Sequence, residues 1–203
     1  MVYFCTVTKG ERTRQQIIEV TAPLFNTKGY EGTSMADLCK ATGLTKGAIY
    51  GSFESKEELS RATFQYAIHQ MRSVGNEGMK GKETYKEKLI ALLEFFTRYV
   101  LDTPVKGGCP LMNTAVEADD HRIGMKKIVA DELQNSITHM TQLIDRGKKA
   151  GEFDPEINSR ETALFFFCAI EGAIMFSRVS SSEEAMKAVV SNIKSIIDSY
   201  SLN

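Results

Sequence analysis

The stretch that decides the fold is Thr33–Phe53, TSMADLCKATGLTKGAIYGSF. The apolar residues of its first half follow the i, i+3, i+4 spacing of a helix that is buried on one side. Ser34, followed three residues later by an aspartate, resembles a shortened capping box, and Gly43 ends this helix. Thr45 is a suitable N-cap for a second short helix, 46–53. Two short helices joined by a tight glycine turn predict a helix-turn-helix unit.

Helical spacing continues on both sides of this unit, and no segment shows the alternation of a strand. The preceding helix, 11–28, contains Pro23, which is expected to kink it, and ends before Gly29, where a left-handed C-cap is expected. Residues 75–82 contain three glycines and no period, which indicates a linker. The sequence therefore predicts an all-α fold of about nine helices. The helices expected after residue 53 are 55–74, 84–101 and 109–118. They are followed by a long helix to about 149 capped by Asp119 or Asp120, by 160–178 capped by Asn158 or Ser159, and by a last helix to about 200 capped by Ser181 or Ser182.

Composition is that of a soluble globular protein, with 42% apolar and 25% charged residues in 203. The net charge is -1, and Lys9–Phe53 holds six Lys/Arg against four Asp/Glu. This small local excess permits DNA binding but does not demand it.

We expect a cytoplasmic protein, because Met1–Gly10 lacks the pattern of a secretory signal. The most apolar stretch, Ala163–Phe176, is shorter than the roughly 20 residues of a membrane span, so it predicts a buried helix. The four cysteines are scattered without CxxC pairing, which is typical of free thiols.

About 50 residues at the N-terminus resemble the TetR family of bacterial regulators in the order and spacing of their motifs. These motifs are APLFNTKGY (22–30), GTSMADL (32–38), GLTKGAIY (43–50) and FESKEEL (53–59). The resemblance implies a ligand-responsive repressor that binds a palindromic operator as a homodimer and leaves it when an effector binds. It also implies three parts: a flexible arm, 1–10, a DNA-binding domain, 11–55, and an effector-binding and dimerisation domain, 56–203.

The resemblance assigns DNA contacts to a small and polar outer face, which suits a helix entering the major groove. We expect Leu38, Leu44, Ile49 and Phe53 to point inward. Ser52 departs from the histidine that the family often has, and serine contacts phosphate more weakly. The expected DNA-contacting residues are Thr33, Ser34, Thr45, Lys46, Gly47, Ala48, Tyr50, Ser52 and Lys56.

The resemblance also implies that the last two helices of each subunit form a four-helix bundle. The penultimate helix is apolar nearly all round, which the surface of a monomer would not tolerate. An ordinary buried core helix is the alternative. The expected dimer residues are Phe165, Ala169, Gly172, Ala173, Phe176, Val189, Ile193, Ile196, Ile197 and Tyr200.

A ligand pocket is implied among the central helices. Its lining should be mostly apolar, which favours a small apolar or amphipathic effector, although the same residues also suit a plain core. The expected pocket residues are Phe95, Phe96, Tyr99, Cys109, Met112, Asn113, Phe166 and Met175.

Cys109 lies in KGGCPLMN (106–113), which resembles a motif of the NemR-like branch of the family, where a cysteine senses electrophiles and hypochlorite. As an N-cap before Pro110 and near Lys106, its thiol should have a lowered pKa and be reactive. A structural cysteine that closes the pocket is the alternative interpretation.

Other functions have less support. Glu117, Asp119, Asp120 and His121 have the side-chain types of metal ligands, but helix capping is the simpler interpretation, and we expect neither metal nor cofactor. No nucleophile, base and acid set or phosphate loop indicates an enzyme. A small helical adaptor that does not bind DNA is the runner-up.

Overall fold

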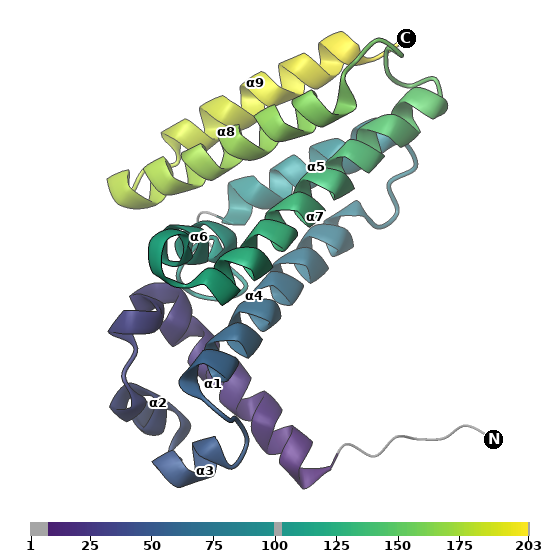
Figure 1. Cartoon of the computed structure of the whole chain (residues 1–203). Coiled ribbons are helices and arrows are strands. Elements are labelled where there is room, and N and C mark those ends of the chain that lie inside the picture. Colours follow the sequence, from purple (N-terminus) through teal and green to yellow (C-terminus); the bar gives the residue numbers. More distant parts are fainter. Residues whose placement is uncertain (1–7, 100–102, 203) are drawn as a thin grey trace, which may run out of the picture.

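The computed structural model describes residues 8–99 and 103–202, which form nine helices and no strand beyond an isolated bridge between Phe153 and Ser201. The predicted all-α class is confirmed. Helices α1–α3 lie at one end of the molecule, and α8 and α9 lie side by side at the other (Figure 1). The helices are α1 (Lys9–Gly32), α2 (Met35–Thr42), α3 (Lys46–Tyr50), α4 (Lys56–Met79), α5 (Tyr85–Tyr99), α6 (Pro110–His121), α7 (Ile123–Lys149), α8 (Ser159–Ser180) and α9 (Glu184–Tyr200).

Local capping chemistry starts α2 and α3 where predicted, but α3 ends at Tyr50 and not at the expected Phe53. Ser34 and Asp37 form a reciprocal capping box at the start of α2, and Gly43 adopts the left-handed conformation after it. The Thr45 hydroxyl accepts a hydrogen bond from the backbone N–H of Ala48 and so caps α3. Because each cap satisfies a backbone group that the helix leaves open, the tight turn between the two helices is stable.

Beside a small cluster of Ala22, Ala67 and Val105, two main apolar cores follow from the helix faces. The smaller one joins α1–α3 to the start of α4 and contains Ile17, Ile18, Leu38, Ile49, Phe53 and Leu59. The larger one fills the space among α4–α9, with Leu93, Phe166 and Ile174 among its most buried side chains. Since α4 contributes to both cores, it connects the helix-turn-helix end to the larger helical body.

The expected arm and linker are wrong where the structure describes them. Thr8 caps α1, so Lys9 and Gly10 are helical rather than part of a loose arm. The expected linker, 75–82, is helical as far as Met79, because α4 packs against α5, with the buried Gly75 next to Leu92 and Phe95. This packing outweighs the low helix propensity of glycine.

Three other expected boundaries also differ. α1 continues through Pro23, and its non-helical residue is Gly29, whose φ of 72° and ψ of 177° do not make the expected left-handed cap. α6 extends to His121, so neither Asp119 nor Asp120 caps α7, and the break falls at Arg122. The N-cap of α9 is Glu183, one residue beyond the expected serines.

Candidate functional site: a helix-turn-helix surface, an interdomain junction and a cavity

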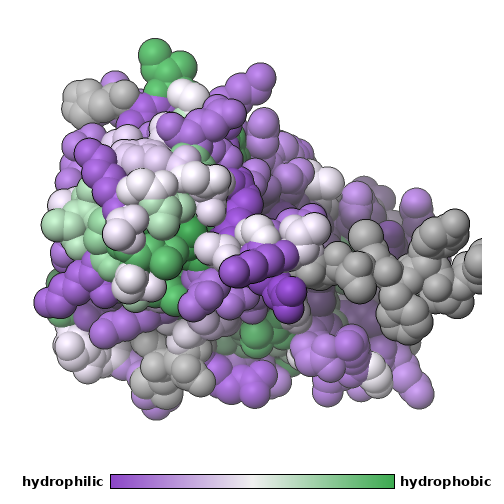
Figure 2. Space-filling view, turned by 90° about the horizontal axis from the view of Figure 1, so that it is seen from below, coloured by the Kyte–Doolittle hydropathy of each residue, from purple (hydrophilic) through white to green (hydrophobic). Residues whose placement is uncertain are grey.

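The outer face of α3 is small and polar, and its inner face anchors the helix. Ile49 is only 1% exposed, whereas Thr45, Lys46, Gly47, Ala48 and Tyr50 are exposed. The Lys46 ammonium lies 5.8 Å from the centroid of the Tyr50 ring. Seen from below, this side of the molecule is mostly hydrophilic or weakly coloured around a small hydrophobic area (Figure 2). The predicted inward positions of Leu38, Ile49 and Phe53 are confirmed, and Leu44 is half-buried against them.

Two residues expected to face DNA point elsewhere. Thr33 is fully buried, and its hydroxyl donates a 2.6 Å hydrogen bond to the carbonyl of Gly29, so its outward placement was wrong. Lys56 is half-buried, and its ammonium donates a 2.6 Å hydrogen bond to the carbonyl of Tyr30. Ser34 is exposed and hydrogen-bonded to Asp37, and Ser52 is half-buried.

Arg14 fixes the turn after α3 against α1. Its guanidinium donates to the carbonyl of Ser52, pairs with Glu58 at 2.7 Å and lies 4.0 Å from the centroid of the Phe53 ring. The hydrogen bond from the Glu54 N–H, and to a smaller extent that from Arg14, holds the pKa of Glu58 below its usual value. Sequence reasoning missed this residue because its partners are about 40 residues away along the chain.

A charged cluster joins the two cores at the end of α1. Arg122 is 9% exposed, donates to both carboxylate oxygens of Glu57 at 2.8 and 2.9 Å, and lies 4.0 Å from the centroid of the Tyr30 ring. Lys56 lies 4.1 Å from the same ring, and burial followed by the charge of Glu57 raises the pKa of Tyr30. We name Tyr30, Lys56, Glu57, Glu117 and Arg122 the junction cluster.

Glu117 links α6 directly to the segment that precedes α2. Its carboxylate accepts a 3.1 Å hydrogen bond from the N–H of Glu31 and lies 3.7 Å from the Arg122 guanidinium. A Cβ on Gly29, whose φ is positive, would lie 2.7 Å from this carboxylate. The positive φ favours glycine there, and the hydrogen bond from the Glu31 N–H ties α6 to the segment before α2.

A second link joins α1 to the loop before α6. The Asn113 side-chain amide donates to the carbonyls of Asn26 and Gly107 at 3.0 and 2.8 Å. Asn26 donates in turn to the carbonyl of Gly108 at 3.0 Å. Asn113 therefore belongs to this link. It was expected to line the cavity, and it does not.

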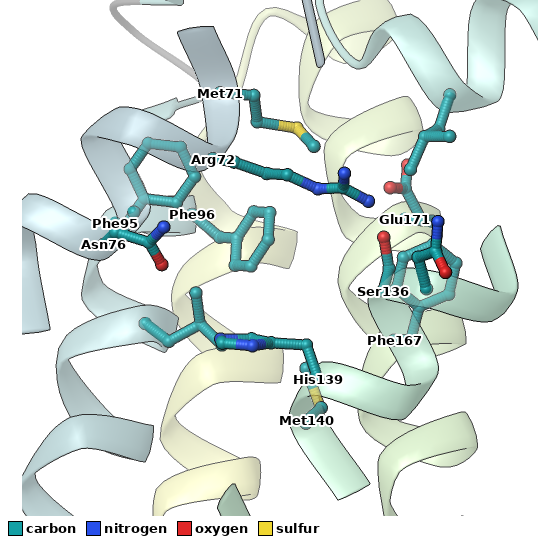
Figure 3. Close-up of a pocket in the computed structure, with 14 residues that line it drawn as sticks. Met71, Arg72, Asn76, Phe95, Phe96, Ser136, His139, Met140, Phe167 and Glu171 are labelled. Carbon is teal, nitrogen blue, oxygen red and sulfur yellow. The ribbon is translucent and has the colours of Figure 1, made fainter. Parts of the chain in front are cut away.

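A cavity of about 330 Å³ lies among α4, α5, α7 and α8. Figure 3 shows Phe95 and Phe96 on one side of it and Phe167 and Glu171 on the other, with the Arg72 side chain extending between them. The lining consists of Met71, Arg72, Gly75, Asn76, Leu92, Phe95, Phe96, Leu111, Asn135, Ser136, His139, Met140, Phe167 and Glu171. Three aromatic rings and several polar side chains thus enclose a space of the size of a small organic molecule.

The outer face of α8 exposes apolar side chains in a continuous stripe. Among the described helices, only α8 is long and apolar enough to cross a membrane, by length and composition alone, and 39% of its most apolar window is buried. One side of it packs on the core through Ala163, Phe166 and Ile170. We name the exposed residues of its other side the α8 stripe: Leu164, Phe165, Cys168, Gly172, Met175, Phe176 and Val179.

Known proteins share both halves of this architecture. Residues 17–63 match the family model of the bacterial regulatory proteins of the tetR family, and residues 86–193 match that of the tetracyclin repressor-like C-terminal domain. The chain belongs to the TetR family. A TetR-family structure from Cytophaga hutchinsonii is 36% identical, with a TM-score of 0.90 over 97% of this chain and 98% of that one.

Other relatives agree in function. A TetR regulator from Chloroflexus aurantiacus is 34% identical, with a TM-score of 0.91 over 95% of this chain and 98% of that one. The HTH-type transcriptional regulator TtgR of Pseudomonas putida is 23% identical over 83% of this chain and 81% of its own length. This TetR-family chain is accordingly a DNA-binding transcriptional regulator and not an enzyme.

Several expected pocket residues lie outside the cavity of this TetR-family protein. Phe95 and Phe96 line it, but Met112 does not, and Phe166 is fully buried in the core next to the lining residue Phe167. Met175 is 53% exposed on the α8 stripe. The side chain of Tyr99 lies outside the described residues. Adjacent side chains on a helix point about 100° apart. An apolar run without polar residues therefore cannot show which of two neighbouring side chains faces the cavity.

The expected reactivity of Cys109 is contradicted. The thiol is fully buried and donates a 3.0 Å hydrogen bond to Glu171, and burial, followed by the charge of Glu171, raises its pKa well above the usual value. The N–H groups of Leu111 and Met112 act in the expected direction, but they are the smaller influence. Cys109 is thus a structural neighbour of the cavity and not an activated thiolate.

Most of the expected dimer residues pack inside the subunit. Ala173, Ile193 and Ile197 are at most 3% exposed, and Ala169, Val189, Ile196 and Tyr200 pack against the same core. The assignments of Ala173, Ile193 and Ile197 were wrong, because these side chains face the subunit's own core. The role of the four partly buried residues stays a prediction. Phe165, Gly172 and Phe176 are exposed, as an interface requires, and their role stays a prediction.

Sequence reasoning also missed Glu171 of the cavity and Arg122 of the junction cluster. Glu171 is the one charged residue in the apolar stretch 163–176, and this isolation was the available indication of a buried role. Arg122 had no comparable indication. Among the described residues, no group of three or more His, Cys, Asp and Glu side chains is gathered to hold a metal ion.

Proposed function

We propose that this TetR-family regulator represses transcription in the cytoplasm by binding a palindromic operator as a homodimer, and that a small effector in the cavity releases it. The observation that carries the proposal is the exposed small and polar face of α3 above the buried Ile49. A helix of this shape fits a major groove about 12 Å wide. An adaptor without DNA binding would have no need of such a face.

Each contact has a chemical role in the proposal. Thr45 and Lys46 donate hydrogen bonds to base edges or phosphates, Ala48 contacts a thymine methyl group, and Tyr50 reaches a phosphate. Gly47 allows close approach of the backbone, and Ser34 and Ser52 contact phosphates nearby. We assign 11–55 to DNA binding and 56–203 to effector binding and dimerisation, with α4 beginning at the boundary.

The dimer is proposed to form through the α8 stripe and one side of α9. That side of α9 exposes the small residues Ala188, Asn192, Ser195 and Ser199 at helical spacing, which permits close approach of two helices. A two-fold axis there pairs two recognition helices, which operators with half-sites about one DNA turn apart require.

Release is proposed to run through the junction cluster. An effector between α4 and α7 displaces these helices, and Glu57 of α4 and Arg122 at the start of α7 hold both against Tyr30. Because α1 and α2 meet next to Tyr30, the spacing of the recognition helices changes when the cluster moves.

The experiment is selection of genomic fragments by the purified protein, followed by fluorescence anisotropy on the selected site at several salt concentrations. We expect a palindromic site. Lys46→Ala should lower affinity and reduce the slope of log K against log salt by about 1, and Tyr50→Ala should also weaken binding. Lys149→Ala, at the exposed end of α7, is the matched control and should bind as the wild type does. Failure to select any sequence-specific site would reject the proposal in favour of an adaptor.

A further inference from the structure

We propose that the cavity selects amphipathic ammonium compounds, with the Glu171 carboxylate binding the cationic head and the aromatic rings enclosing the apolar body. This inference rests on the proposed function in taking the cavity as the effector site. It adds the chemical class of the effector, which the comparisons leave open.

Glu171 is a buried acid without a charge partner. One carboxylate oxygen, Oε1, accepts the hydrogen bond from the Cys109 thiol at 3.0 Å. The other, Oε2, is buried and has no hydrogen-bond partner among the described residues. A buried polar atom of this kind costs about 1–3 kcal/mol unless it is satisfied. A ligand that donates a hydrogen bond at this point removes that cost.

The surroundings of Glu171 favour a positively charged ligand over a neutral hydrogen-bond donor. Burial raises the pKa of Glu171, and the thiol of Cys109 is the one group that acts in the opposite direction. Among the residues that the structure describes, no lysine or arginine compensates the carboxylate, so a ligand cation would be its counter-ion. Phe167, one turn before Glu171 on α8, and Phe95 and Phe96 across the cavity present the rings that attract cations (Figure 3).

The alternative is an anionic ligand held by Arg72, and it is less favoured because Arg72 already has a counter-ion. Arg72 lines the cavity, but its guanidinium already pairs with Glu132 of α7. His139 faces the cavity as well, and burial, together with Arg72 and Arg146, lowers its pKa, which leaves it neutral near pH 7. The cavity therefore contains one compensated cation and one uncompensated acid.

The test uses three probes with one apolar body and different heads: 4-phenylbutylamine, 4-phenylbutanol and 4-phenylbutyrate. Each fits a cavity of about 330 Å³. Binding is measured by isothermal titration calorimetry on the full chain, which contains no tryptophan for fluorescence quenching. We expect the amine to bind about tenfold more tightly than the alcohol, and the carboxylate to bind most weakly.

Two variants test the role of Glu171. Glu171→Gln should reduce the preference for the amine over the alcohol to less than about twofold. Glu94→Gln removes an acid of α5 that pairs with Lys194 outside the cavity, and it should keep the preference. Equal affinity for amine and alcohol in the wild type, preference for the carboxylate, or no binding of any probe would each overturn the inference.

A second measurement does not depend on the folding of Glu171→Gln. Titration of the amine into wild-type protein at pH 5, in buffers of different ionisation enthalpy, should show proton release, because the raised pKa leaves part of the Glu171 carboxyl protonated there and a bound cation ionises it. Absence of proton release, with no loss of preference in Glu171→Gln, would assign the selectivity elsewhere. Operator binding without any probe reports on the proposed function separately, so the two can fail independently.

Discussion

Truncation of Phe176 on the α8 stripe should dissociate the dimer. Phe176 is 56% exposed in the subunit. Since a phenylalanine side chain buries about 150–250 Å², about 100 Å² remains to be covered in a dimer. At about 25 cal/mol per Å², this contributes about 2.5 kcal/mol per subunit. Phe176→Ala removes most of this burial free energy from each of the two subunits, about 4 kcal/mol in all. The dissociation constant of the dimer should therefore rise on the order of a thousandfold.

Sedimentation equilibrium over a range of protein concentrations measures this dissociation constant, and anisotropy on the operator should show a parallel loss of affinity. Circular dichroism should show an unchanged helical fold, because most of this side chain lies outside the core. Val116→Ala is the control, since Val116 is 78% exposed on α6, away from the stripe, and should leave dimerisation unchanged. A Phe176→Ala protein that dimerises as tightly as the wild type would refute the assignment of the α8 stripe to the interface.

Three further predictions concern stability, thiol reactivity and pH. Arg122→Met should lower the free energy of unfolding by about 2 kcal/mol, because it leaves Glu57 without its partner; urea denaturation at a fixed protein concentration measures this. Lys126→Met, which breaks the exposed pair with Asp119, should cost less than about 0.5 kcal/mol. Equal effects of the two substitutions would contradict the burial argument. Cys109 should react with iodoacetamide at pH 8 only after unfolding, as followed by peptide mass spectrometry, because its raised pKa and burial keep it as a thiol; rapid labelling of the native protein would show the reverse. Affinity for the ammonium probe should rise from pH 5 to pH 7, because the pKa of Glu171 is raised and its ionised form, which binds the cation, is lost as the pH falls. His139→Gln should keep this rise, and Glu171→Gln should abolish it, since Arg72 stays charged and Cys109 stays protonated throughout.

Ligand-induced release couples these predictions to one another. Glu57 lies on α4 one residue after Lys56, and both side chains reach Tyr30 or its partner Arg122. Met71 and Arg72 on the same helix line the cavity. A rigid α4 therefore transmits a shift at the cavity to the junction cluster, and Arg122→Met should weaken the response of operator binding to an effector as well as stability.

Sequence alone determined the features that depend on neighbours along the chain. The caps at Ser34, Thr45 and Ser55, the left-handed Gly43 and the buried stripe of α2 all follow from backbone groups and side chains within four residues of one another. The same local order gave the resemblance to the TetR family, and hence the class of function.

Only the tertiary structure decided which side of each helix faces what. Thr33 was assigned to DNA, but it turns inward because the carbonyl of Gly29 is left open where α1 breaks. Ile193 and Ile197 of α9 were assigned to a partner, but they close the subunit's own core. Glu171 acquires its cavity and its raised pKa from the packing of other helices against α8, and its thiol partner, Cys109, is 62 positions away along the chain. The helix-turn-helix of Thr33–Phe53 could be predicted because its stabilising contacts are local, whereas burial and charge in the cavity depend on how distant helices pack.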